Sequence, residues 1–95
     1  MLHINDSTLK FLSERYFVNL TRGKNDLFGL FHINGTIIEI SQDSSAQNSR
    51  INIGDQIKSI NGKNVSGQEN IQRTFIEYSS SRSITLTLTK SSGIF

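Results

Sequence analysis

Side chains suited to acid–base catalysis or metal binding are sparse in this chain of 95 residues. The two histidines, His3 and His32, lie far apart in the sequence, there is no Cys, and no cluster of carboxylates accompanies either His. Zinc sites draw on several His and Cys ligands, and nucleophilic catalysis needs a nucleophile beside a base. The sequence therefore predicts no metal site, no cofactor and no enzymatic activity.

Basic residues are scattered singly between Lys10 and Lys90, and the formal net charge is only +2. Nucleic-acid-binding proteins usually gather their Lys and Arg on one face. No apolar run approaches the roughly 20 residues of a membrane span. We therefore expect neither nucleic-acid binding nor membrane insertion, and the lack of Cys fits a reducing, cytoplasmic setting.

The length suits one domain, because two independent cores would need more residues. We expect an N-terminal extension over residues 1–14, a domain over 15–90 and a C-terminal tail over 91–95. Hydrophobic residues make up 35% of the chain and include six Phe and two Tyr. Such a composition can fill a small core, which argues against general disorder.

Strand, turn and helix signals alternate along this domain. Asn34-Gly35 between two β-rich runs predicts a type I′ hairpin. Ser66 followed by Glu69 matches a capping box at the start of a helix. Beyond it, Ile71, Phe75 and Tyr78 recur on one helical face. The expected elements are strands at 16–20, 28–33, 36–40, 57–60 and 83–89, a short helix or turn at 44–50, and a long helix after residue 66.

This order predicts a mostly β fold with two helices. We expect a small antiparallel β-sandwich or partly open barrel, capped by a short and a long helix. In the last strand, Ile84, Leu86 and Leu88 alternate with Ser and Thr, so they should face the core.

Three segments together resemble the PDZ domain family over roughly residues 15–90. The run Ile51-Asn52-Ile53-Gly54-Asp55-Gln56-Ile57-Lys58-Ser59-Ile60-Asn61-Gly62 looks like the signature that follows the short first helix of that family. Arg22-Gly23 followed by Leu27-Phe28-Gly29-Leu30 is similar to its carboxylate-binding loop, usually Gly-Leu-Gly-Phe after a basic residue. The capped helix and the last strand complete the order.

The resemblance implies a peptide-binding site with particular residues. The amides of Phe28, Gly29 and Leu30 would bind the terminal carboxylate of a peptide, because consecutive backbone N–H groups in a tight turn form an anion nest. Arg22 would support that carboxylate through water. The peptide would add as a strand beside Phe31-His32-Ile33, with the long helix as the other wall of the groove.

Two departures from the family pattern affect the loops. Leu27 stands where the loop usually has its first Gly, and Arg50 stands where a Gly often precedes Ile51. A left-handed turn at Arg50 would cost roughly 1 kcal/mol. The register is also open, because the loop is either Leu27–Leu30 or Phe28–Phe31 unless a bulge resets the phase of the strand.

The helix residue that selects the antepenultimate ligand residue is ambiguous. Counting from Val65 at the usual spacing gives Asn70, and one extra residue would give Ile71 with Phe75 one turn further on. His32 is a further groove candidate. In many PDZ domains the selecting residue is His, which favours Ser or Thr in the ligand. Neither Asn70 nor Ile71 is His, so a strict preference for Ser or Thr is not expected.

The function implied is that of an adaptor or signalling-scaffold module that captures C-terminal peptides of other proteins, membrane proteins among them. It would then be cytoplasmic and reach membranes only through partners. The alternative is a regulatory PDZ unit of a larger protease or signalling enzyme. Self-association, with Phe95 of one copy in the groove of another, is a further hypothesis.

Overall fold

The computed structural model describes residues 15–91, and its core rests on strands whose side chains alternate between buried and exposed. In β1 (Arg15–Thr21), Tyr16, Val18 and Leu20 are buried, and the residues between them are exposed. β1 pairs antiparallel with β6 (Ser83–Thr89), from Arg15 opposite Thr89 to Thr21 opposite Ser83. The predicted inward face of the last strand is confirmed, since Ile84, Leu86 and Leu88 are buried.

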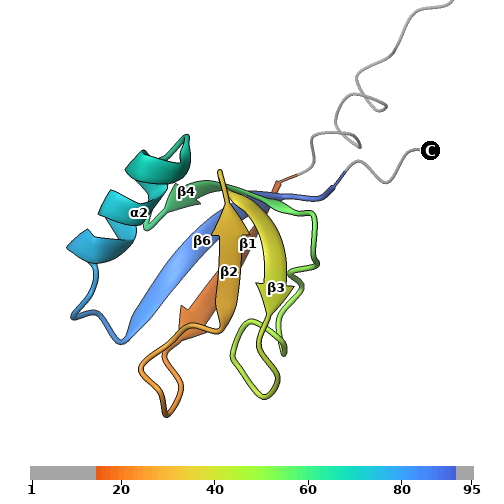
Figure 1. The fold of residues 1–95 in the computed structure, drawn as a ribbon, viewed down its shortest axis with the longest axis vertical. Coiled ribbons are helices and arrows are strands. Elements are labelled where there is room, and N and C mark those ends of the chain that lie inside the picture. Colours follow the sequence, from red (N-terminus) through yellow and green to blue (C-terminus); the bar gives the residue numbers. More distant parts are fainter. Residues whose placement is uncertain (1–14, 92–95) are drawn as a thin grey trace, which may run out of the picture.

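The strands form one antiparallel sheet in the order β1-β6-β4-β3-β2 (Figure 1). β4 (Gln56–Ile60) lies next to β6 and also pairs with the short β5 (Lys63–Asn64). β3 (Thr36–Ile40) and β2 (Leu30–Ile33) complete the sheet. Within the described residues, β2 therefore has one strand neighbour and leaves its outer edge unpaired.

The β2–β3 hairpin turns at Asn34-Gly35, where φ is 53° and 87°, as a type I′ turn requires. Its register shifts between Phe31 and His32: Phe31 lies opposite Glu39, but His32 lies opposite Ile37. Ile38 is thus the extra residue of a bulge. Along β2, side chains alternate: Leu30 and His32 are half-buried, whereas Phe31 and Ile33 are exposed.

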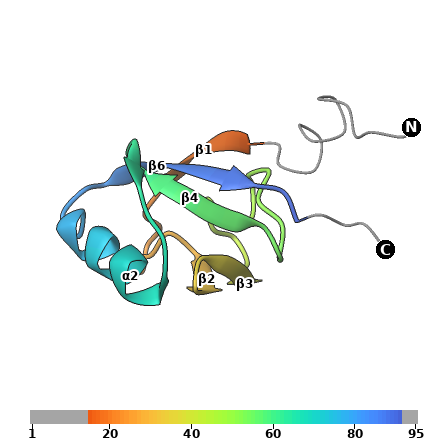
Figure 2. The ribbon, with the colours of Figure 1, turned by 90° about the horizontal axis from the view of Figure 1, so that it is seen from above.

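One helix, α2 (Gln68–Glu77), is present within residues 15–91, and it packs against the sheet through Ile71 and Thr74 (Figure 2). Of the two alternatives expected at 44–50, a short helix or a turn, the structure has irregular turns, so the expected second helix is wrong. Its Ser side chains bond the local backbone: Ser44 Oγ donates to Ser41 O, and Ser49 Oγ to Ala46 O. Such bonds compete with helical ones.

The predicted capping box is also wrong. The N-cap is Gly67, and no side chain of its own caps the helix. Asn70 Oδ1 instead accepts from the Ser66 N–H at 2.8 Å, and Glu69 pairs with Arg73. The helix consequently begins slightly later than the sequence pattern indicates, at Gln68.

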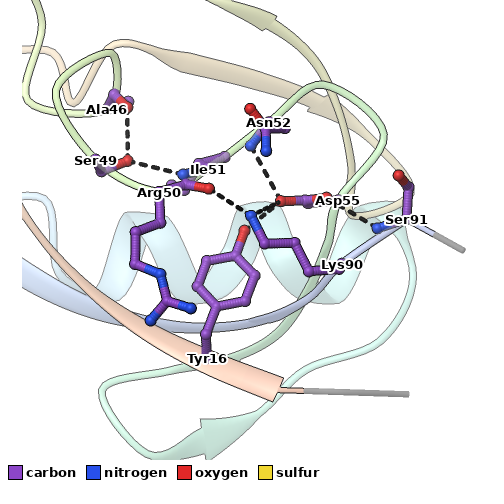
Figure 3. A network of polar contacts seen from close by, with 9 residues as sticks. All are labelled: Tyr16, Ala46, Ser49, Arg50, Ile51, Asn52, Asp55, Lys90 and Ser91. Atoms are coloured by element: carbon purple, nitrogen blue, oxygen red, sulfur yellow. Dashed lines mark hydrogen bonds and ion pairs between the residues drawn. The ribbon is translucent and has the colours of Figure 1, made fainter. Parts of the chain in front are cut away.

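A buried polar network lies where β1 begins and β6 ends (Figure 3). Asp55, only 1% exposed, accepts hydrogen bonds from the Tyr16 hydroxyl, the Asn52 N–H and the Ser91 N–H. Lys90 Nζ lies 3.6 Å from Asp55 Oδ2. We call Tyr16, Asp55, Lys90 and Ser91 the Asp55 network; it joins the turn before β4 to the first and last described strands.

The partners of Asp55 determine its charge state. Burial alone would raise the pKa of the Asp55 carboxyl, but the bonds from Tyr16, Asn52 and Ser91, with Lys90 nearby, hold it below its usual value. Burial raises the pKa of the Tyr16 hydroxyl, and its bond to Asp55 adds to this effect. Asp55 is therefore an ionised acceptor, and Tyr16 is its neutral donor.

The expected extension at residues 1–14 and most of the expected tail, residues 92–95, lie outside the described residues. The division of the chain at 15 and 90 stays a prediction.

Candidate functional site

A cavity of about 400 Å³ lies between β2 and α2. Leu30, Phe31 and His32 line it from the strand, and Arg22, Leu27, Phe28 and Gly29 line its loop end. From the helix come Gln68, Gln72, Phe75 and Ile76, which recur at the spacing of one helical face, and Ser79 follows just beyond the helix end. We call this cavity, together with the free edge of β2, the groove.

The loop that closes one end of the groove depends on Gly29. Its φ is 91°, a conformation that side-chain-bearing residues rarely adopt, and a Cβ added here would overlap the side chain of Ser44. The Gly29 carbonyl accepts from the Ser41 N–H at 2.7 Å. Gly29 thus allows the backbone to turn sharply and to pack closely against the segment of Ser41 and Ser44.

Two amides of this loop have no intramolecular acceptor. Within residues 15–91, neither the Phe28 N–H nor the Gly29 N–H donates a hydrogen bond, although both residues are buried. Backbone donors left without a partner near a cavity favour an external acceptor. Their position at the end of the cavity fits an anion more than a neutral apolar group.

Arg22 holds the loop against the end of α2. Its Nε donates to Ser81 O at 2.7 Å, its Nη2 to Tyr78 O at 3.0 Å, and its Nη1 to Asp26 O at 2.7 Å. The guanidinium also lies 4.3 Å from the centre of the Phe28 ring. Since α2 has no basic residue in its last turn, Arg22 supplies the cation that stabilises this helix end.

The opposite end of the groove is bridged by Asn34 and Gln68. The Gln68 N–H donates to Asn34 Oδ1 at 3.1 Å, and the Asn34 N–H donates to Gln68 Oε1. Asn34 comes from the hairpin turn and Gln68 is the first residue of α2. Elements on both sides of the groove are therefore joined directly at this end.

His32 lies in the middle of the groove. Its ring stacks on Phe75 with 6.0 Å between the ring centres, and its Nδ1 accepts from the Gly35 N–H at 3.1 Å. Burial lowers the pKa of the imidazole, so it is neutral at pH 7 with its proton on Nε2.

The structure separates the predicted site residues into two groups. The cavity brings together Arg22, Phe28, Gly29, Leu30, Phe31, His32 and Phe75. It does not include Ile33, Asn70 or Ile71. Ile33 is 59% exposed on the outer side of β2, and Ile71, 1% exposed, is a core residue. Asn70 is occupied by its bond to Ser66.

The groove residues of α2 that sequence reasoning missed are Gln68, Gln72 and Ile76. The count along the helix started from Val65 and gave Asn70 or Ile71, neither of which lines the cavity. Helical spacing is the signal that identifies them, because Gln68, Gln72 and Ile76 share one face of α2 with Phe75. Ile76 on this face is 69% exposed.

At the two positions that depart from the family pattern, Leu27 and Arg50, the backbone avoids positive φ. Leu27 does not take a left-handed conformation; Asp26, the residue before it, does, with φ 64°. Arg50 also avoids positive φ. Leu30 and His32 lie on the more buried side of β2 and line the cavity, which supports the Leu27–Leu30 assignment of the loop.

Other kinds of site find no support among residues 15–91. No group of three or more His, Cys, Asp or Glu side chains is arranged to hold a metal ion in this range. None of the helical structure described there is long and apolar enough to cross a membrane.

Comparison with known proteins agrees with this geometry. The fold is similar to the N-terminal PDZ domain of InaD in complex with a NorpA C-terminal peptide, with a TM-score of 0.68, 23% identity, and coverage of 80% of this chain and 96% of that one. It is also similar to the PDZ1 domain of dmPar3 in complex with the dmPar6 PBM (0.66, 17%, 77% and 91%). A third is the PDZ domain of choanoflagellate SHANK1 bound to a GIRK3 peptide (0.68, 14%, 82% and 93%).

No curated protein matches the chain significantly. The family description "PDZ domain", however, matches residues 7–89, which is most of the sequence. The chain belongs to the PDZ domain family.

Proposed function

We propose that this chain binds the C-terminal carboxylate of a partner protein, with the peptide added as a strand to the free edge of β2. One observation carries the proposal: two unpaired loop amides, those of Phe28 and Gly29, lie at the end of an apolar groove beside an open sheet edge. A terminal carboxylate satisfies the amides, and the peptide backbone satisfies the strand edge.

The groove indicates which parts of the ligand would be held. Phe28, Leu30, Phe75 and Ile76 supply an apolar pocket next to the loop, which suits a large apolar last residue. Peptide complexes of the three similar structures are consistent with this use of the fold. Leu30 supplies the third amide of the proposed carboxylate site.

Arg22 acts in this proposal as a positioning residue. Three of its five N–H groups, one each on Nε, Nη1 and Nη2, donate to carbonyl oxygens of the loop and the segment after α2. It therefore sets the position of the loop against α2, and its charge adds a favourable field for an anion. This differs from the water-mediated contact suggested by the family resemblance.

Matched peptides test the proposal. An octapeptide ending in Ile-Phe with a free carboxylate should bind, and its C-terminal amide should bind at least about tenfold more weakly, since tenfold corresponds to one lost charge-assisted contact of about 1.4 kcal/mol. Isothermal titration at fixed salt measures both affinities. Equal binding of the two peptides would exclude carboxylate capture.

The finer parts of the proposal concern the partner and its setting. We propose an adaptor role, with membrane proteins among the partners and a cytoplasmic location. Proximity labelling of the full-length protein in cells tests both; recovery of secreted or lumenal proteins alone would contradict the location. No observation in residues 15–91 favours a protease or signalling-enzyme context.

Self-association through Phe95 would have to occur between copies. Phe95 lies outside the described residues, but Ser91 is placed beside Asp55, beyond the end of β6. The four following residues reach at most about 14 Å, whereas β6 alone separates this end from the loop by about 20 Å. Deletion of Ile94 and Phe95 should then abolish concentration-dependent dimerisation in sedimentation experiments; unchanged dimerisation would contradict this.

A further inference from the structure

Ser79 is a hydroxyl residue at the loop end of the groove that carboxylate capture does not use. It lies in the turn that follows α2, it is exposed, and it lines the cavity together with Arg22 and Phe28. Figure 1 shows this turn and the loop before β2 at the same end of the sheet. A phosphate attached to the Ser79 hydroxyl would therefore lie at the edge of the groove and not on a remote surface.

Arg22 fixes the position of this turn relative to the loop. Its Nη2 donates to Tyr78 O at 3.0 Å and its Nε donates to Ser81 O at 2.7 Å, so the guanidinium bonds to carbonyl groups on both sides of Ser79. Tyr78 O belongs to the peptide group shared with Ser79, which places Ser79 Cα within about 6 Å of Arg22 Nη2. The guanidinium in turn lies 4.3 Å from the centre of the Phe28 ring. A group on the Ser79 side chain thus starts next to both Arg22 and the loop.

The charges around Ser79 indicate where an attached phosphate would settle. The last carbonyl groups of α2 carry partial negative charge and would repel it. Arg22 attracts it, because this residue carries the only formal charge in the cavity lining, and two of its five N–H groups are not used by its bonds to carbonyl oxygens. The Phe28 and Gly29 amides, which have no acceptor within residues 15–91, lie at the same end of the cavity. The phosphate is therefore drawn from the helix end toward the loop.

A phosphate on Ser79 and a ligand carboxylate would compete for this end of the groove. Both are anions that draw on the same amides and on the charge of Arg22, and the phosphate carries about −1.5 to −2 at pH 7. Like charges a few Å apart repel strongly where water is partly excluded. Because the phosphate is attached to the chain, it occupies the site at the high effective concentration of an intramolecular group.

We propose that Ser79 is a phosphorylation site and that its phosphate closes the loop end of the groove to C-terminal carboxylates. A protein kinase would use ATP as the donor: Ser79 Oγ forms a bond to the γ-phosphorus, the bond from that phosphorus to the bridging oxygen breaks, ADP leaves, and the hydroxyl proton is released. Hydrolysis of the phosphate ester reopens the groove. This inference rests on the proposed carboxylate capture and concerns its regulation.

The first test compares the chain of residues 1–95 in three forms: unmodified, phosphorylated at Ser79, and phosphorylated at Ser80. Ser80 is the matched control, because it is the next residue and is also exposed but does not line the cavity. Isothermal titration uses the octapeptide that ends in Ile-Phe with a free carboxylate. Phosphate on Ser79 should weaken binding at least about tenfold, and phosphate on Ser80 at most about threefold. Phosphatase treatment should restore the unmodified affinity.

A second measurement does not depend on the ligand. A phosphoserine loses its second proton at a pKa of about 6. In the free protein phosphorylated at Ser79, the NMR signals of the Phe28 and Gly29 amides should follow this titration between about pH 5 and pH 7. In the protein phosphorylated at Ser80, these signals should change with pH only as they do in the unmodified protein.

Three results would overturn the inference while leaving carboxylate capture intact. One is equal loss of affinity in the two phosphorylated proteins, which would indicate a general effect of charge. Another is amide signals of Phe28 and Gly29 that do not follow the phosphate titration. The third concerns the full-length protein isolated from its own cells with phosphatase inhibitors: mass spectrometry should find phosphate on Ser79, and recovery of unmodified Ser79 alone would contradict the proposed modification. If the unmodified chain binds no peptide with a free carboxylate, the proposed function itself is wrong, and the amide signals still decide whether the phosphate reaches the loop.

Discussion

The Asp55 network and the groove differ in whether their polar groups have hydrogen-bond partners. In the network, each oxygen of the buried Asp55 carboxylate has a partner, and those partners come from β1, the turn before β4 and the residues after β6. In the groove, the Phe28 and Gly29 amides have none within the described residues. Saturated polar groups make the first region a structural joint. Unsatisfied ones leave the second ready for an external partner.

Helix α2 has satisfied polar groups at both ends and borders the open groove between them. Both of its ends are stabilised by groups from outside the helix: Asn34 at the start and Arg22 at the end. These two residues also stand at the two ends of the groove. The groove thus has fixed ends while its floor remains apolar and open, which is a preorganised arrangement for binding.

The largest expected effect comes from breaking the network. Asp55→Ala leaves Tyr16, Asn52 and Ser91 without their acceptor and Lys90 without its counter-charge, so the free energy of unfolding should fall by about 3–5 kcal/mol. Chemical denaturation measures this. Peptide affinity, determined under conditions in which the variant is folded, should not change. A selective loss of affinity would show that the two regions are coupled.

The next effect is expected in the loop. Gly29→Ala forces a Cβ onto a left-handed residue, which costs about 1–2 kcal/mol, and the Cβ would overlap Ser44. We expect peptide affinity to fall by at least about tenfold. Adding Ser44→Gly should restore part of the affinity, because it removes the overlap but not the φ strain. Titration of both variants with peptide measures these affinities. An unchanged peptide affinity in Gly29→Ala would contradict the role proposed for the Phe28–Leu30 loop.

A smaller effect distinguishes the position of Arg22 from its charge. Arg22→Lys keeps the charge but cannot bond Ser81, Tyr78 and Asp26 together, so unfolding should become about 1 kcal/mol easier. Peptide affinity should fall about threefold or more as the loop loosens. Arg73→Lys, on the exposed side of α2, is the control. Unchanged affinity in Arg22→Lys would mean that the charge alone matters.

The smallest effects separate the two regions by pH. The pKa of His32 is lowered by burial, so stability from its neutral form is present above the usual value of 6.5 and is lost as pH falls below it. The pKa of Asp55 is also lowered, and its contribution is lost only as pH falls below the usual 3.8. Denaturation from pH 7 to pH 3 measures the difference in free energy of unfolding between the wild type and each of the variants His32→Phe and Asp55→Asn. As pH falls, the difference for His32→Phe should decline first and the difference for Asp55→Asn second. The reverse order would contradict the assignment.

Local signals explain what sequence could predict. Asn34-Gly35 carries its turn type in its own residues, and the Ile51–Gly62 run identified the family that residues 7–89 match. The inward face of the last strand followed from strict alternation. Each of these features depends on residues adjacent in the chain.

Features that depend on distant partners were missed. The Ser66–Glu69 pattern resembles a cap, but the first amide of α2 bonds to Asn34, more than 30 residues away. The count from Val65 missed the groove residues Gln68 and Gln72. The bulge at Ile38 leaves no mark in composition, so the register of β2 stayed open. At 44–50, serines bonding their own backbone outweighed the helical expectation.

The Asp55 network also determines how the domain would respond to mechanical load. Tyr16 and Ser91, near the first and last described residues, bond the same carboxylate, and Figure 1 shows β1 beginning where β6 ends. A pull on the two ends would first strain Asp55 and then open the β1–β6 pair stepwise from Arg15 and Thr89 toward Thr21 and Ser83. The Phe28–Leu30 loop lies beyond that last pair, so tension would reach it late. A ligand could stay bound while the opposite end of the domain carries the force.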